Sequence, residues 1–299
     1  MAANSRSGHA FVAFARRVYH PMGFSKGYNF VLFFIFAGAF TGFTLARLQY
    51  LAIDRSCESK SGDRPLGCYY YTRGSIDRIG IILHLGTILP GSLLVILQFV
   101  PIIRRSVVLF HRINGYLIII LSLVPTAGAI MLARNSVGGR TEVQTSIGVL
   151  SIAFVVCLAL AWYNIKRLQI EQHREWMLRA WFYDYPACES YFTHGDTSTN
   201  VLVPATMAGD GSNRMASFSH NFGAALWLAL ALHAVGVEIY LRLTPAEANR
   251  LRNVSYQRQL EAGMKSPGRA GLTADRLGNS DLWKPNTDQN EQDGGEVSK

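Results

Sequence analysis

The sequence predicts an all-α polytopic integral membrane helix bundle, because its apolar residues gather in a few long blocks. The chain has 299 residues, of which 49% are apolar and 16% are charged. An apolar helix of about 20 residues crosses a hydrocarbon layer of roughly 30 Å, and a soluble core would not need several blocks of that length. The blocks cover residues 28–51, 79–102, 113–132, 143–165 and 221–241.

The charge pattern supports a lipid bilayer, and no nucleic acid, as the environment of the chain. The formal net charge is +9, but Lys and Arg are expected beside membrane spans by the positive-inside rule. No RNA- or DNA-binding motif accompanies the charge. The first apolar block starts too late and runs too long for a cleaved signal peptide, so we expect it to act as a signal anchor. No segment identifies an organelle.

Residues 1–27 form a basic leader ahead of the first span. Arg16, Arg17 and Lys26 lie in it, and this predicts a cytosolic N-terminus. In the first span, Gly38 and Gly42 form a small-xxx-small pair that leaves room for a close helix contact.

Two of the four cysteines share the polar loop between the first two spans. An oxidising lumen would allow Cys57 and Cys68 to form a disulfide. Cys157 lies within the fourth span, where we expect it to be packed, and Cys188 has no evident partner.

The second span carries a stripe of small and polar residues at steps of three and four. Such a stripe lies on one face of a helix and is expected to contact protein instead of lipid. Pro90 is expected to bend this span. The stripe consists of His84, Thr87, Gly91, Leu94 and Gln98.

The connection between the second and third spans has the strongest cytosolic signature in the chain. It carries Arg104, Arg105 and Arg112 and no acidic residue. The third span then runs outward, and the fourth returns inward to end at Lys166 and Arg167.

After the fourth span, the stretch from Glu171 to Trp181 begins a helix that we expect to stop within about two turns of Arg179. Trp176 and Trp181 suit the headgroup belt of a membrane. Residues 184–219 are rich in Gly, Ser, Thr, Asp and Asn, and are predicted to form an irregular loop.

The last span ends with Glu238 and Arg242, which are spaced for an i to i+4 ion pair. Residues 244–265 are predicted to form a basic amphipathic helix, and 266–299 a polar, disordered tail.

The number of predicted spans conflicts with the charge of the C-terminal tail. Five spans that start from a cytosolic N-terminus put the tail outside, although its basic residues favour the inside. The sequon at Asn253 could carry a glycan only if the tail is luminal.

Several motifs resemble the predicted membrane proteins grouped as domain of unknown function 2306. They are His84, Gln98-Phe99-x-Pro101, Arg104-Arg105, His111-Arg112-x-x-Gly115-Tyr116 and His173-Arg174-x-Trp176-Met177-x-Arg179. The C-terminal part, from Ala225-Leu226-Trp227 through Thr244-Pro245-Ala246-Glu247, resembles the fungal branch of that family, whose members are often labelled microtubule-associated protein. The resemblance implies a multi-pass membrane fold and no established activity.

In similar proteins the motif that starts at His173 leads into a complete membrane helix. Here Tyr183 joins what resembles the far end of the following loop, so a span is missing by this comparison. Either a gene model has skipped coding sequence or the protein has lost a helix.

Four histidines fall in or beside spans, where ionisable groups often mark function. His84, His111, His173 and His233 are candidate ligands of haem b or of a transition metal, because neutral imidazole binds these groups. His111 and His173 both lie at the inner edge and would form a metal site with Glu171. His84 and His233 differ in depth by roughly 10 Å if both spans start outside, which makes a poor haem pair.

The alternative interpretation is that the His-Arg pairs cap the membrane interface. No glycine-rich phosphate loop, zinc-protease helix or nucleophile elbow is present in the sequence. The sequence therefore does not decide whether the protein is an enzyme. Our first hypothesis is an accessory or structural membrane protein with protein partners. The alternative is a haem- or metal-binding membrane oxidoreductase, and a weaker one is a small-molecule carrier whose path follows the stripe of the second span.

Overall fold

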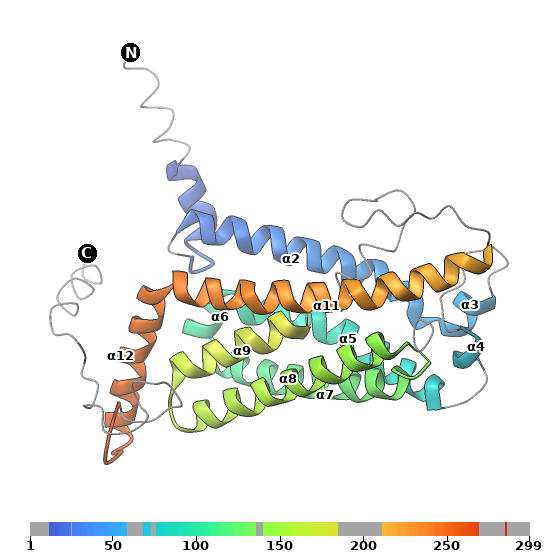
Figure 1. The fold of residues 1–299 in the computed structure, drawn as a ribbon. Helices are drawn as coiled ribbons and strands as arrows, with labels where there is room; N and C mark the ends of the chain where they lie inside the picture. The colour runs from blue at the N-terminus through green and yellow to red at the C-terminus, as the bar shows by residue number, and fades with distance from the viewer. Residues whose placement is uncertain are drawn as a thin grey trace. The chain divides into compact units, whose positions relative to one another are not determined.

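The computed structural model describes residues 12–24, 26–58, 68–72, 76–135, 140–184, 211–268 and 285. All regular structure in these ranges is helical (Figure 1). Five helices are long and apolar enough to cross a membrane, which confirms the prediction of an all-α polytopic membrane protein. They cover Gly27–Leu51, Ile76–Phe99, Val108–Leu132, Thr141–Lys166 and Gly223–Leu243.

The chain divides into two compact units. The first comprises residues 1–147 with 206–221, and the second comprises residues 148–205 with 222–299. In the first unit the elements are α2 (Gly27–Arg47), η1 (Leu48–Leu51), α3 (Ile53–Glu58), α4 (Cys68–Tyr71), α5 (Ile76–Phe99), α6 (Pro101–Ser106) and α7 (Val108–Leu132).

Proline sets the end of α5. The sequence predicts that the second span reaches residue 102, but α5 ends at Phe99 and a short helix, α6, begins at Pro101. Proline has no N–H to donate to the preceding turn, yet it fits the first position of a new helix. Pro90 is tolerated inside α5.

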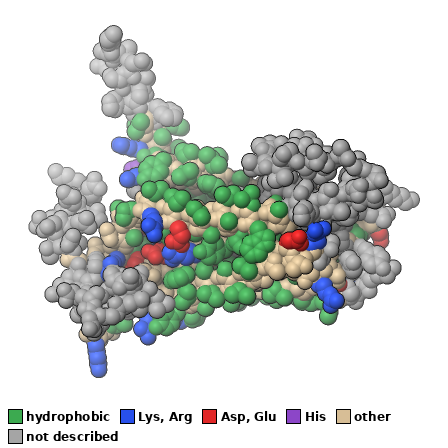
Figure 2. Space-filling model, in the orientation of Figure 1, with side chains coloured by type: hydrophobic (Ala, Val, Ile, Leu, Met, Phe, Trp, Pro, Cys, Tyr) green, Lys and Arg blue, Asp and Glu red, His purple; other side chains and the backbone are tan. Residues whose placement is uncertain are grey.

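Helix α2 exposes large apolar side chains, as a lipid-facing helix does. Phe34 and Phe36 are both exposed, and hydrophobic side chains cover much of the surface of the long helices in Figure 2. At Gly38 and Gly42, a Cβ atom added to the glycine would have no atom of the described residues within 4 Å. The close helix contact expected at this pair is therefore not made by the described residues.

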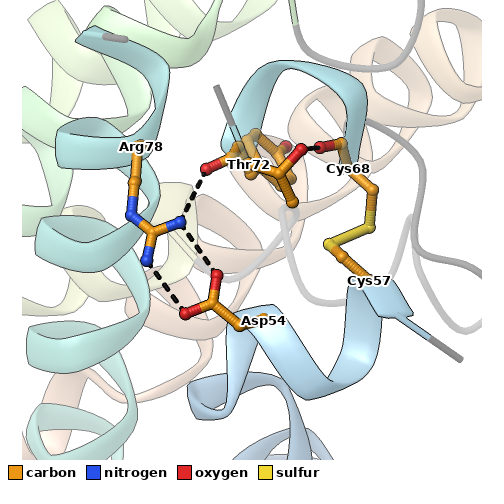
Figure 3. The surroundings of a disulfide bond; sticks show 6 residues. Asp54, Cys57, Cys68, Thr72 and Arg78 are labelled. Atoms are coloured by element: carbon orange, nitrogen blue, oxygen red, sulfur yellow. Dashed lines mark hydrogen bonds and ion pairs between the residues drawn. A yellow bond between two sulfur atoms is a disulfide. The ribbon is translucent and has the colours of Figure 1, made fainter. Parts of the chain in front are cut away.

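A disulfide joins two short helices that follow the first span. Cys57 of α3 bonds to Cys68 of α4, with their Cα atoms 5.4 Å apart (Figure 3). Beside it, Arg78 at the start of α5 donates two hydrogen bonds to Asp54, at 2.8 and 2.9 Å. The Arg78 guanidinium lowers the pKa of the Asp54 carboxyl through these bonds. The disulfide and the ion pair together hold α3 and α4 at the end of α5.

The described residues of the second unit form four helices. They are α8 (Thr141–Lys166), which enters the unit at Gly148, α9 (Ile170–Asp184), α11 (Gly211–Leu243), which enters it at Phe222, and α12 (Pro245–Glu261). Helix α11 begins within the segment 184–219 that the sequence predicts as a loop, so the residues from 211 to 219 are helical instead. No proline follows Gly211 before Pro245, and nothing therefore stops the helix from starting early.

Helix α9 has 15 residues and ends at Asp184, within two turns of Arg179 as predicted. It follows a tight turn in which Leu168 has a φ of 58°, and it runs antiparallel to α8. Trp181 contacts Phe154, near the middle of α8, with ring centroids 6.0 Å apart. Trp181 therefore packs against the middle of a candidate membrane span, and its place in the headgroup belt stays a prediction.

Candidate functional site

The small and polar stripe of α5 packs against α7. Nδ1 of His84 lies 2.9 Å from the carbonyl oxygen of Pro125. Further along, Asn114 donates a hydrogen bond to the Leu94 carbonyl at 3.2 Å, and Gln98 donates one to the His111 carbonyl at 3.3 Å. The stripe contacts protein, as predicted. Because α7 lies along it, the stripe is a packing seam between two helices, and the carrier path expected there stays a prediction.

A tight contact between α5 and α7 involves two glycines outside the predicted stripe. A Cβ atom added to Gly128 would lie 2.6 Å from the carbonyl oxygen of Gly80 and 2.9 Å from the backbone nitrogen of His84. Gly80 precedes His84 by four residues, so continuing the stripe one helical turn toward the N-terminus would have identified it.

Two of the candidate histidines share one hydrogen-bond geometry. Nδ1 of His84 faces the Pro125 carbonyl, and Nδ1 of His173 lies 3.0 Å from the Ala161 carbonyl of α8. A carbonyl oxygen only accepts, so in both rings the proton is on Nδ1 and the lone pair is on Nε2. Burial lowers the pKa of His173 and favours its neutral form, although the bond to Ala161 opposes this. Neutral rings held in this way are the form that binds metal or haem iron.

Neither unit by itself brings two candidate histidines together. In the first unit His84 lies opposite Pro125, which is 14 residues, or about 21 Å, along α7 from His111. In the second unit the ring of His233 lies 6.2 Å from the ring of Phe182, nine residues, or about 14 Å, along α9 from His173. The described residues contain no cluster of three His, Cys, Asp or Glu side chains suited to a metal ion.

Glu171, the expected carboxylate of the metal site, is used in another contact. It is buried and accepts a hydrogen bond from the hydroxyl of Ser255 in α12. The same hydroxyl accepts a bond of 2.8 Å from the backbone N–H of Ile170. His111 belongs to the first unit and His173 to the second, so their approach to one another stays a prediction.

Helix α12 is therefore bound to the turn between α8 and α9. Besides Ser255, the buried Gln259 holds α12 in place. Its side-chain amide donates a hydrogen bond to the Arg167 carbonyl at 3.1 Å, and its Oε1 accepts one from the backbone N–H of Gly268 at 2.7 Å. The C-terminal helix thus lies on the same side of the spans as Arg167. The sequence predicts that side to be cytosolic.

A charged group on α9 reaches toward α11. Arg179 donates two hydrogen bonds to the Glu238 carboxylate, at 2.6 and 3.1 Å, and lies 3.7 Å from the Glu175 carboxylate. Its guanidinium also lies 4.7 Å from the centre of the Trp176 ring. Glu238 therefore pairs with Arg179 of another helix, and the expected i to i+4 ion pair with Arg242 is not formed.

Comparison with known proteins gives one result. Residues 81–203 match the sequence model of the family described as "Predicted membrane protein (DUF2306)". This confirms the resemblance for the part of the chain that includes most of α5 and all of α7, α8 and α9. The fungal branch and the missing span after Tyr183 stay predictions. Neither a search of curated proteins nor a search of solved structures finds a match.

Proposed function

We propose that this chain, whose residues 81–203 have the pattern of the DUF2306 membrane proteins, is an accessory membrane protein that binds another protein at its cytosolic side. The use of its buried and half-buried polar side chains supports this proposal. His84, Asn114 and Gln98 bind the facing helix in the first unit, and Ser255 and Gln259 bind α12 to the α8–α9 turn in the second. These side chains hold helices in place and do not converge on a common centre.

Helix α12 is the element that we expect to contact the partner. Its buried side, formed by Ser255 and Gln259, fixes it to the turn beyond the spans. Its other side presents Leu260, together with the exposed ion pair between Arg258 and Glu261. We expect Leu260 to be buried by the partner and the charges of Arg258 and Glu261 to lie at the polar rim of the contact.

Site-specific photo-crosslinking tests this function. A photoreactive residue at Leu260 should give an adduct with one protein of defined mass, whereas the same residue at Ile152, exposed on α8, should give lipid adducts only. The double variant Glu171→Gln with Ser255→Ala frees α12, and we expect it to lower the Leu260 adduct several-fold. Ser151→Ala, which removes a different buried serine that lies in α8, should have no effect. The absence of a protein adduct at Leu260 in the membranes of the source cell would contradict the proposal.

The geometry of His84 and His173 favours a second candidate function, the binding of haem b or a transition metal for electron transfer. Both rings are held through Nδ1 and leave Nε2 as a lone-pair donor. A bound haem iron or copper would supply the one-electron chemistry. The protein residues would hold the ring orientation through the Pro125 and Ala161 carbonyls.

A reduced-minus-oxidised visible spectrum with metal analysis tests this candidate on the detergent-purified chain. We expect a band or a stoichiometric metal that is lost in His84→Ala or His173→Ala and kept in His20→Ala, because His20 is exposed and lies outside the spans. A flat spectrum without metal, in a preparation that melts cooperatively, would exclude the redox function.

A further inference from the structure

The second unit has a groove between α9 and α11 that the proposed function does not use. Its volume is about 530 Å³, and it is lined by Tyr183, Ala234, Val235, Glu238, Ile239 and Arg242. Residues 235, 239 and 242 follow one another at steps of four and three, so they lie on one face of α11. The groove is therefore apolar toward the middle of the span and polar at its end.

The polar end of the groove carries Arg242 beside the ion pair between Glu238 and Arg179. Arg179 donates two hydrogen bonds to the Glu238 carboxylate and also lies 3.7 Å from the Glu175 carboxylate. Arg242 lies one helical turn closer to the end of the span and is exposed. Among the described residues it makes no hydrogen bond and no ion pair within 4 Å. Its guanidinium is therefore available to an anion.

The apolar part of the groove is lined by exposed side chains. Val235 and Ile239 are 59% and 53% exposed, and such side chains on a membrane span contact acyl chains. An Arg at the end of a span lies at the depth of the headgroups, where its planar fork matches the oxygens of a phosphate. A ligand with an anionic head and an apolar chain therefore fits both parts.

We propose that this groove binds one phospholipid of the adjoining leaflet. Its phosphate contacts the Arg242 guanidinium, and one acyl chain lies along Ala234, Val235 and Ile239, beside Tyr183. The charge of Arg242 and the apolar character of one face of α11 carry this assignment. Bulk lipid would contact the same face whether or not Arg242 is present. Replacement of Arg242 therefore distinguishes a specific lipid site from contact with bulk lipid.

Native mass spectrometry after extensive detergent washing tests the site. The probe is phosphatidylglycerol, added to washed protein at increasing concentration. We expect the wild-type chain to bind one lipid more tightly than any further lipid. Arg242→Gln should weaken this first binding step about tenfold, the effect of losing one charge-assisted hydrogen bond, and Arg242→Lys should weaken it less. Val235→Trp should fill the groove and also weaken binding.

The matched control is Arg258→Gln, which removes an arginine of α12 that pairs with Glu261 away from the groove. It should bind the first lipid as the wild type does. Equal binding by Arg242→Gln and the wild type would overturn the proposal, as would equal weakening by Arg242→Gln and Arg258→Gln, because the attraction would then be nonspecific. A retained protein in place of lipid would also overturn it. Unchanged melting temperatures of Arg242→Gln and Val235→Trp, both at exposed positions, show that loss of binding is not loss of fold.

Discussion

Replacement of Arg179 by methionine is expected to lower the free energy of unfolding by about 2 kcal/mol. This is less than the 3–5 kcal/mol typical of breaking a fully buried ion pair, because the Glu238 side chain is 44% exposed. The change keeps an unbranched apolar stem but leaves the carboxylates of Glu175 and Glu238 without their shared cation. Cooperative thermal or denaturant unfolding in a mild detergent measures the effect.

The triple variant Arg179→Met with Glu175→Gln and Glu238→Gln tests whether the lost stability comes from the two carboxylates that are left without a cation. It removes the stranded charges together with the cation, and we expect it to recover most of the lost stability, since replacing a whole ion pair costs less than breaking it. Arg174→Met is the matched control on the same helix, because Arg174 contacts the ring and hydroxyl of Tyr240 and no carboxylate among the described residues. If Arg174→Met destabilises the chain as much as Arg179→Met, the ion pair is not the cause.

The membrane spans could be predicted from the sequence because their signal is local. A block such as 113–132 is apolar along its whole length, and α7 contains all of it. The boundaries that differ have local causes as well. Pro101 ends α5 early, whereas α11 starts at Gly211 because no proline interrupts it.

The packing of helix α9 could not be predicted in this way, because its partners are distant in the sequence. Its 15 residues include Glu171, Glu175 and Arg179, so a hydropathy profile does not mark it as a membrane span. Ser255 donates a hydrogen bond to Glu171 and Glu238 accepts two from Arg179, and these partners lie 84 and 59 residues further along the chain. The predicted pairing of Glu238 was wrong for the same reason, since the i to i+4 rule sees only neighbours on one helix.

The candidate histidines show the same limit. Their positions beside spans could be read from the sequence, but the carbonyl partners of His84 and His173 depend on how α5 packs on α7 and α9 on α8. His84 and His111 are too far apart along α7 to be two ligands of one haem, and His173 and His233 are too far apart along α9. A spacing rule applied to a single helix contains no information of this kind.

Replacement of Gly128 by alanine is expected to lower the free energy of unfolding by about 1–3 kcal/mol, the usual cost of an extra methyl group in a tight packing site. The added Cβ would lie 2.6 Å from the Gly80 carbonyl oxygen and 2.9 Å from the His84 nitrogen. Both atoms belong to the backbone of α5, so they cannot move aside by a change of rotamer. The two helices have to separate, which also weakens the bond between His84 and Pro125.

Gly86→Ala is the matched control, because Gly86 lies in the middle of α5 and has no atom of the described residues within 4 Å of an added Cβ. Alanine favours a helix over glycine by about 1 kcal/mol, so this variant should be as stable as the wild type or more so. Gly80→Ala should fall between the two, since its nearest atoms are at 3.1 Å. Thermal unfolding in one detergent should therefore rank the variants as Gly86→Ala, Gly80→Ala and Gly128→Ala in decreasing stability. Equal stability of Gly128→Ala and Gly86→Ala would show that α5 and α7 do not approach each other at Gly80 and Gly128.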